Sequence, residues 1–135
     1  MSCLSDYAEN LVLTWLLTAD APAAAARPTA WFVALHTGDP GETGASNEVL
    51  VATDADYVRK AITFANGSGG QSLSTLEVSW TVNSASAGYT VTHASVWDAL
   101  SAGNCLFKGP LLASRALIAN GVLTFSVGEI VATAD

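Results

Sequence analysis

The side chains with the clearest potential for chemistry in this 135-residue chain are two histidines, each followed by an aspartate. His36 precedes Asp39, and His93 precedes Asp98. Two imidazoles and a carboxylate form a donor set that can bind a transition metal. Their spacing matches no metal motif, so we expect both histidines to be structural groups held by hydrogen bonds. We expect no metal to be required.

The residues of nucleophilic catalysis are present, but not in a catalytic arrangement. Such catalysis needs a Ser or Cys beside a histidine that a carboxylate orients. The chain has no Gly-x-Ser-x-Gly elbow, and Cys3 and Cys105 lie far apart without a Cys-x-x-Cys motif. The glycine-rich run 67–70 lacks the Lys-Ser/Thr pair of a phosphate-binding loop. We therefore expect no catalytic residue, no cofactor and two inert thiols in a reducing compartment.

Five acidic residues gather within 18 positions of the chain. They are Asp39, Glu42, Glu48, Asp54 and Asp56. Calcium accepts oxygen ligands of this kind, but the alternate-residue spacing of an EF-hand loop is absent. The sequence therefore predicts a solvated acidic loop.

Four tryptophans are large anchors for so short a chain. Trp15, Trp31, Trp80 and Trp97 are expected to serve mainly in core packing, with one or two of them in an interface, where aromatic residues are enriched. The candidate interface residues are Leu11, Trp15, Leu16, Trp31 and Trp97.

The composition narrows the function classes. The chain is 50% apolar and only 13% charged, with a net charge of −7, whereas soluble domains carry about 25% charged residues. High apolar content and low charge exclude a disordered chain. A membrane span is excluded because the longest uncharged stretch, residues 78–97, is full of Ser, Thr and Asn. Five cations are too few to track phosphates, so we expect no direct nucleic-acid or membrane partner. Low charge favours an obligate oligomer or a large assembly.

The N-terminal segment shows helical spacing of its apolar residues. The face consists of Leu4, Ala8, Leu11, Val12, Trp15 and Leu16. This spacing predicts one amphipathic helix over about residues 3–18, and Pro22 and Pro28 then predict an extended connector. The helix could pack on its own domain or reach a neighbour, and we favour a subunit or capsid interface. The segment has no basic run typical of a signal peptide, so we expect synthesis and retention in a cytoplasm.

The rest of the chain has the alternation and turn signals of β-structure. Strands are predicted at 30–36, 57–64, 76–82, 89–97, 104–112 and 122–131, with a bulge near 94–95 and an optional edge strand at 49–51. Pro110 argues for an edge position or a break. The fold class predicted is mainly β, an antiparallel β-sandwich or jelly-roll-like barrel of six to eight strands with one N-terminal helix. The predicted division is a helix at 1–21, a linker at 22–29 and a β-sandwich domain at 30–135.

Several segments together resemble a family of small tailed-phage virion proteins, described as tail-fibre-like or head-decoration-like. The resemblance rests on a Leu-His strand end and an Asp-Pro-Gly-rich turn at 34–44, Asn-Glu at 47–48 and a Tyr-x-Arg strand at 57–64. A later His before Trp-Asp at 91–98, and the segment 103–107, also fit. The likeness covers about residues 4–132.

The resemblance implies a non-enzymatic β-sandwich that oligomerises, often as a trimer, in the virion after assembly in the host cytoplasm. Together with the low charge, it leads to a capsid decoration (cement) protein that binds the major capsid protein. The alternative is a tail-fibre or tail-tip module bound to other virion proteins. A glycan-binding or hydrolytic module is a third hypothesis.

Overall fold

A computed structural model describes residues 3–17 and 27–134 of the chain. These ranges contain one helix and nine strands. In chain order they are β1 (Cys3–Leu4), α1 (Asp6–Leu17), β2 (Trp31–His36), β3 (Lys60–Ile62), β4 (Gln71–Leu73), β5 (Val78–Thr81), β6 (Tyr89–Trp97), β7 (Cys105–Leu117), β8 (Val122–Phe125) and β9 (Val131–Thr133).

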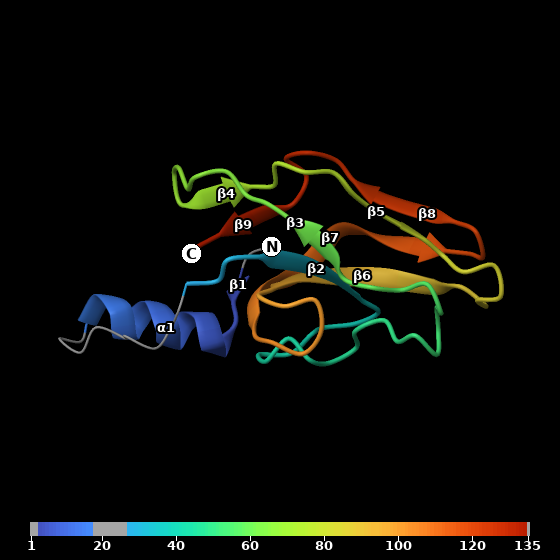
Figure 1. Cartoon of the computed structure of the whole chain (residues 1–135), viewed down its shortest axis with the longest axis horizontal. Coiled ribbons are helices and arrows are strands. Elements are labelled where there is room, and N and C mark those ends of the chain that lie inside the picture. Colours follow the sequence, from blue (N-terminus) through green and yellow to red (C-terminus); the bar gives the residue numbers. More distant parts are fainter. Residues whose placement is uncertain (1–2, 18–26, 135) are drawn as a thin grey trace.

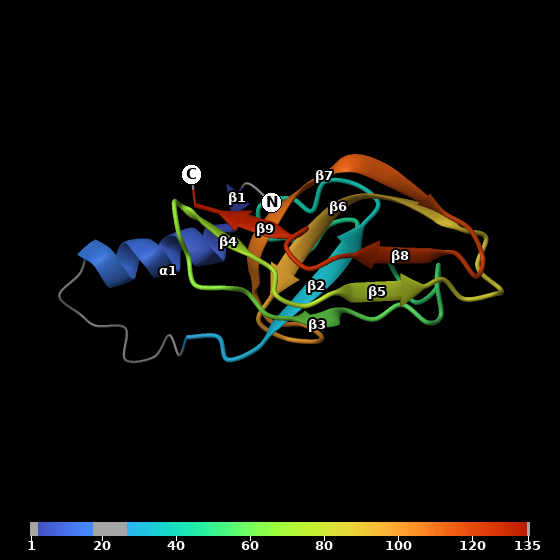
Figure 2. The same cartoon turned by 90° about the horizontal axis from the view of Figure 1, so that it is seen from above.

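The strands form two layers of antiparallel β-structure. One layer is a five-stranded sheet in the order β1-β7-β6-β2-β3, and the other consists of the pairs β4-β9 and β5-β8. Figure 2 shows the second layer lying across the five-stranded sheet. The prediction of a mainly β, antiparallel fold with one N-terminal helix is confirmed. The sheet is open rather than closed into a barrel, because β1 and β3 are its edges.

The main core lies between the two layers. Strand β2 contributes the alternate residues Val33 and Leu35 to this core, and Ala34 and His36 are buried on its other face, so the strand is buried on both sides as expected. Across the core Trp80 meets Phe125 edge to face, with ring centroids 6.1 Å apart. The Trp80 indole also donates a hydrogen bond of 2.8 Å to the Val58 carbonyl. Trp80 is therefore a core residue with its polar atom satisfied.

Loops rather than strands cover the outer face of the five-stranded sheet. Figure 1 shows the loops after β2 and after β6 lying beneath β2 and β6, opposite the second layer. Under them Ala34, Trp97 and Cys105 form a small second core. These loops contain the acidic segment and the turn at 98–103, so the outer face is where the sequence motifs meet.

The predicted strands differ from the observed ones mainly near the second layer. The predicted strand 122–131 is two strands, β8 and β9, because a turn at 126–130 separates them and Gly128 there adopts a φ of 79°. Strand β4 was not predicted, and in the optional strand at 49–51 the first two residues have no regular structure and the third begins a turn. Of the predicted strand 57–64 only Lys60–Ile62 is paired as a strand.

The predictions for β6 and β7 come closer. Strand β6 has the predicted bounds, and register shifts lie between Val91 and His93 and between Val96 and Trp97, on either side of the expected bulge. Pro110 lies inside β7, beyond the two residues that pair with β1. Its missing N–H therefore faces an unpaired edge, as proline in a strand requires.

The N-terminal helix is shorter than predicted and differently packed. Residues 3 and 4 belong to β1, which pairs with β7, and the helix begins at Asp6. Of the predicted apolar face only Ala8 is buried. Residues 18–26 lie outside the described ranges, so the helix end at 18 and most of the predicted connector 22–28 fall there. The division into helix, linker and sandwich domain stays a prediction.

Candidate functional site

Residues of the sequence motifs meet in a buried hydrogen-bonded chain on the outer face. His36 is fully buried, with Nδ1 2.8 Å from the Ser46 carbonyl and Nε2 2.6 Å from Ser95 Oγ. The carbonyl can only accept, so Nδ1 carries the proton and Nε2 accepts from Ser95. Trp97 Nε1 donates to the same hydroxyl at 2.7 Å. Burial lowers the pKa of His36 and keeps the ring neutral.

Arg59 joins the same face to both covering loops. Its Nε and Nη2 each donate to a Glu48 carboxylate oxygen at 2.8 Å, a two-bond ion pair. Nη1 donates to the carbonyls of Ala99 and Ala102, at 3.1 and 2.9 Å. The guanidinium lies 3.8 Å from the Trp97 ring centre, within cation–π range. Arg59 thus forms buried hydrogen bonds that connect the acidic loop to the turn at 98–103.

Glu48 and Tyr57 complete this cluster. Burial acts to raise the pKa of Glu48, but the hydrogen bonds and charge of Arg59 hold that pKa below its ordinary value. The Tyr57 hydroxyl donates to Glu48 at 3.1 Å and accepts from the Leu35 backbone N–H at 3.0 Å. Burial raises the pKa of Tyr57, so the phenol stays protonated. Neither group is poised for proton transfer near neutral pH.

The predicted solvated acidic loop is wrong for Asp54. This carboxylate is 1% exposed and accepts hydrogen bonds from the backbone N–H groups of Asp56 and Asn83, at 3.1 and 3.0 Å, and from the Tyr89 hydroxyl, at 2.8 Å. Such donors satisfy a buried carboxylate without a cation. Asp54 therefore joins the acidic loop to the β5–β6 connection.

The remaining predicted site residues hold separate structural bonds. His36 and His93 are direct partners across β2 and β6, but Nδ1 of His93 pairs with Thr92 at 2.8 Å. Asp39 accepts from Gly41, and Asp98 accepts from Asn104. No group of three or more His, Cys, Asp or Glu side chains in the described part of the chain could hold a metal ion.

Cys105 is buried beneath the same loops. Burial raises the pKa of its thiol to about 11, so the thiolate needed of a nucleophile is disfavoured. Gly44 packs directly against this side chain, with a φ of +75°. A Cβ there would collide with Cys105, which explains the glycine in this turn.

A run of exposed apolar side chains lies on α1. Trp15 is 70% exposed, and Leu13, Leu16 and Leu17 are each more than half exposed. Figure 1 shows α1 extending beyond the end of the sandwich. Within its own chain, α1 contacts mainly β1 and β7. Free proteins rarely present a contiguous apolar surface of this kind without a partner.

The five interface candidates fall into three environments. Trp15 and Leu16 are exposed, and Leu11 is partly exposed. Trp31 is half-buried at the edge of the main core. Trp97 is 5% exposed and packs inside its own chain, so little of its ring is available to a partner. Sequence periodicity alone carried no signal that separated Trp97 from Trp15.

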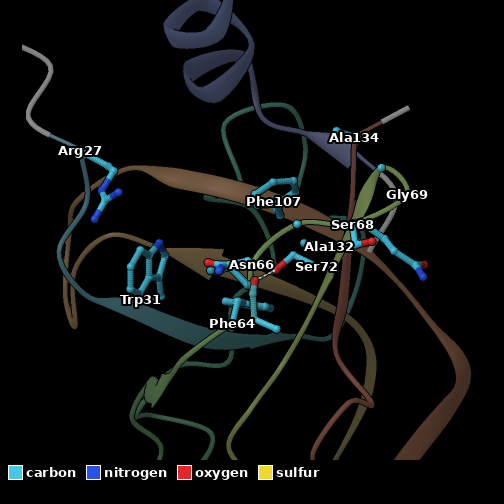
Figure 3. Close-up of a pocket in the computed structure, with 15 residues that line it drawn as sticks. Arg27, Trp31, Phe64, Asn66, Ser68, Gly69, Ser72, Phe107, Ala132 and Ala134 are labelled. Atoms are coloured by element: carbon cyan, nitrogen blue, oxygen red, sulfur yellow. Dashed lines mark hydrogen bonds between the residues drawn. The ribbon is translucent and has the colours of Figure 1, made fainter.

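A pocket of about 620 Å³ opens at the same end of the sandwich. Figure 3 shows Trp31, Phe64 and Phe107 around this pocket, with Asn66, Ala132 and Ala134 on the β4–β9 side. Arg27 stands at the rim. We call this space the end pocket. Among the described residues that line it there is no Asp or Glu, so it lacks the converging carboxylates of a hydrolytic cleft.

No helix in the described ranges has the length and apolar character needed to cross a membrane.

Comparisons with known proteins identify the family of the chain. A search of curated proteins gives no match to the chain. The model of one family, described as "Podophage GP4 fiber I protein gp80", matches residues 3–133.

This match covers nearly the whole chain and confirms the resemblance to small tailed-phage virion proteins. It also confirms a virion location, with assembly in the host cytoplasm. Of the two structural hypotheses, it supports the tail-fibre alternative better than capsid decoration. The chain belongs to the family of the podophage GP4 fiber I protein gp80, a family of structural virion proteins.

Proposed function

We propose that the chain is a non-enzymatic structural subunit of a phage tail fibre, and that it works as a homotrimer. The single observation that supports association best is the exposed apolar half of α1. A fibre is built by repeated contacts between subunits, and such contacts bury apolar side chains. The description of the family supports placement in a fibre rather than on the capsid.

The chemistry of the outer face supports a structural role. His36 bonds to the Ser46 carbonyl, and Arg59 bonds to Glu48 and to the Ala99 carbonyl. These bonds hold the two covering loops on the sheet. A catalytic group needs access to a substrate and a proton affinity suited to transfer. These side chains instead resemble a fully satisfied polar network, which makes a folded domain rigid.

Locating the protein on virions tests this function. Antibodies against the purified chain, carrying gold particles, would be viewed by electron microscopy on intact phage. We expect gold at the tail fibres and none on the head. Gold spread over the capsid surface would contradict the fibre assignment and revive capsid decoration.

A matched control guards against blocked epitopes. Virions disrupted into separate heads and tails would be labelled in parallel, so that surfaces buried in the intact particle become accessible. Label that stays with the tail fraction supports the proposal, and label that stays with the head fraction contradicts it.

A further inference from the structure

The apolar surface of α1 is wider than one packing face requires. Its last seven residues are Leu11, Val12, Leu13, Thr14, Trp15, Leu16 and Leu17. At about 100° per residue, the six apolar positions span an arc of roughly 240°, while a helix on a core needs an arc of about 100°. A surface this wide is covered from more than one side. Its own domain supplies contacts mainly near β1 and β7.

The start of α1 is fixed in a way that keeps it off its own end pocket. The Ser5 backbone N–H donates to the Leu106 carbonyl at 3.1 Å, and the Ser5 hydroxyl donates to the Cys105 carbonyl. The same hydroxyl accepts the Ala8 N–H at 3.3 Å and caps the helix. Strand β1, which pairs with β7 just before the helix, adds a second attachment at the start of α1. Figure 1 shows it pointing away from the strands.

The end pocket is a second uncovered apolar surface, at the same end of the molecule. Val96 and Phe107 are direct partners across β6 and β7, and both line the pocket together with Trp31. The pocket is therefore the part of the sheet's inner face that the second layer leaves open. Its volume of about 620 Å³ is in the range of pockets that bury a ligand. The part that apolar side chains would contact is formed by Trp31, Phe64 and Phe107.

Charge also matches the two surfaces. The first turn of α1 carries Asp6 and Glu9, and the helix has no basic residue. The rim of the end pocket carries the cation Arg27, with no acid among its described lining residues. The charge on α1 is therefore acidic only, so no cation of the helix meets Arg27 when the apolar half enters the pocket.

We propose that α1 of one copy of this chain packs into the end pocket of the next copy. The inference rests on the proposed self-association of the fibre subunit and names its contact. The donor and acceptor surfaces differ, so the interface is heterologous, and the proposed trimer is the case in which its rotation closes into a ring. Three copies would each give one helix and receive one. The wide arc of α1 then divides between the receiving pocket and its neighbours around the axis.

Two variants with exposed substitutions separate donor from acceptor. The helix variant, Trp15→Gln with Leu16→Gln, keeps good helix formers but removes apolar surface. The pocket variant, Asn66→Glu with Ala134→Glu, places charge on two exposed lining residues. The control variant, Leu50→Gln with Val51→Gln, removes two equally exposed apolar side chains from the loop on the outer face. Full-length chains would be compared by sedimentation, with circular dichroism to show that each is folded.

The decisive step is to mix the two defective variants. We expect each alone to sediment as a 13.8 kDa monomer, while wild type and control form the same larger particle. Mixed together, they retain one good helix and one good pocket, so they should form a one-to-one complex and nothing larger. A pocket variant that assembles like wild type would overturn the proposal and favour packing of helices on each other. If that variant also lost binding to host oligosaccharides, the pocket would belong to a glycan instead.

This experiment fails independently of the proposed function. Gold labelling decides whether the protein lies in the fibre, whereas the mixing experiment decides how copies contact one another. A trimer that survives the pocket substitutions would leave the fibre assignment standing and remove only the exchange of helices. A wild-type chain that stays monomeric at all concentrations would contradict both the exchange and the homotrimer, while gold labelling would still decide the fibre assignment.

Discussion

At the scale of single residues, Arg59 illustrates how the motif residues serve the fold. It is 8% exposed, yet carries a charge that Glu48 balances, and it donates four hydrogen bonds. A buried ion pair adds little net stability over an apolar pair, but removing one partner leaves an uncompensated charge. The pair therefore makes correct placement of both loops a condition of stable folding.

Removing the Glu48 carboxylate should be costly. We expect Glu48→Ala to lower the free energy of unfolding by about 3–5 kcal/mol, since Arg59 stays buried without its partner. The matched control is Glu77→Ala, because Glu77 carries the same carboxylate on an exposed residue. That change should cost at most about 1 kcal/mol. Urea unfolding monitored by fluorescence measures the free energy of unfolding of both variants. Equal losses in the two variants would contradict a buried Arg59–Glu48 ion pair.

Stability should fall in mild acid because of His36. Burial lowers its pKa below the ordinary value of 6.5, with Glu48, Arg59 and His93 the charged or titratable groups that also act on it. The unfolded chain binds the proton first as pH falls, so the stability is complete above about 6.5 and is lost below it. The lowered pKa of Glu48 adds a further loss below 4.5. We expect the Tm to drop between about pH 7.5 and 5.5.

The two histidines provide the control for this effect. His93→Gln should keep the acid-dependent drop in Tm, whereas His36→Asn should be less stable at neutral pH and show a smaller drop. A wild-type Tm that stays constant or rises as the pH falls through this window would contradict a buried neutral His36.

Some of these residue roles could be predicted from the sequence, and others could not. Two histidines without a metal motif were expected to form hydrogen bonds, and both do. The burial of Asp54 could not be predicted, because it depends on donors 29 and 35 positions away in Asn83 and Tyr89. The same holds for Arg59, whose carbonyl partners are at least 40 positions later.

At the scale of elements, the sequence predicted strands well where their bounds depend on nearby residues, and less well where a turn or a distant strand decides them. Strand β6 was predicted to the residue, although its alternation slips where the register shifts. The break between β8 and β9 depends on a turn in which Ser126 accepts the Glu129 N–H at 3.0 Å and donates its own N–H to the Glu129 carboxylate at 2.8 Å. Alternation continues across such a turn, so the pattern alone read it as one strand. Strand β1 was hidden because its two residues also fit helical spacing.

Ser5 should be the residue that fixes α1 to the sheet. It caps the helix and bonds to β7 from both its backbone and its side chain. We expect Ser5→Ala to lower the free energy of unfolding by about 1–2 kcal/mol and to weaken self-association, because α1 loses its fixed direction. Ser2→Ala is a control for the loss of a hydroxyl near the N-terminus. Chemical unfolding and sedimentation measure the two effects, and an unchanged assembly would contradict a fixed helix.

At the scale of the whole molecule, the prediction of an assembly protein came from composition and resemblance together. Low charge and many apolar residues indicated surface covered by protein, and the family match confirms a virion component. The sequence analysis chose capsid decoration over a tail fibre from low charge and resemblance, and the family match supports the tail-fibre alternative better. Which tryptophans are exposed depends on tertiary packing, and the structure separates Trp15 from Trp80 and Trp97.

The most direct test of the central claim is the mass of the wild-type protein in solution. Light scattering after size-exclusion chromatography, over a range of micromolar concentrations, would measure it without substitutions or labels. The account predicts a particle of three times the 13.8 kDa chain mass, with Trp15 shielded from a soluble fluorescence quencher. A particle of one chain mass at every concentration, with Trp15 freely quenched, would contradict it.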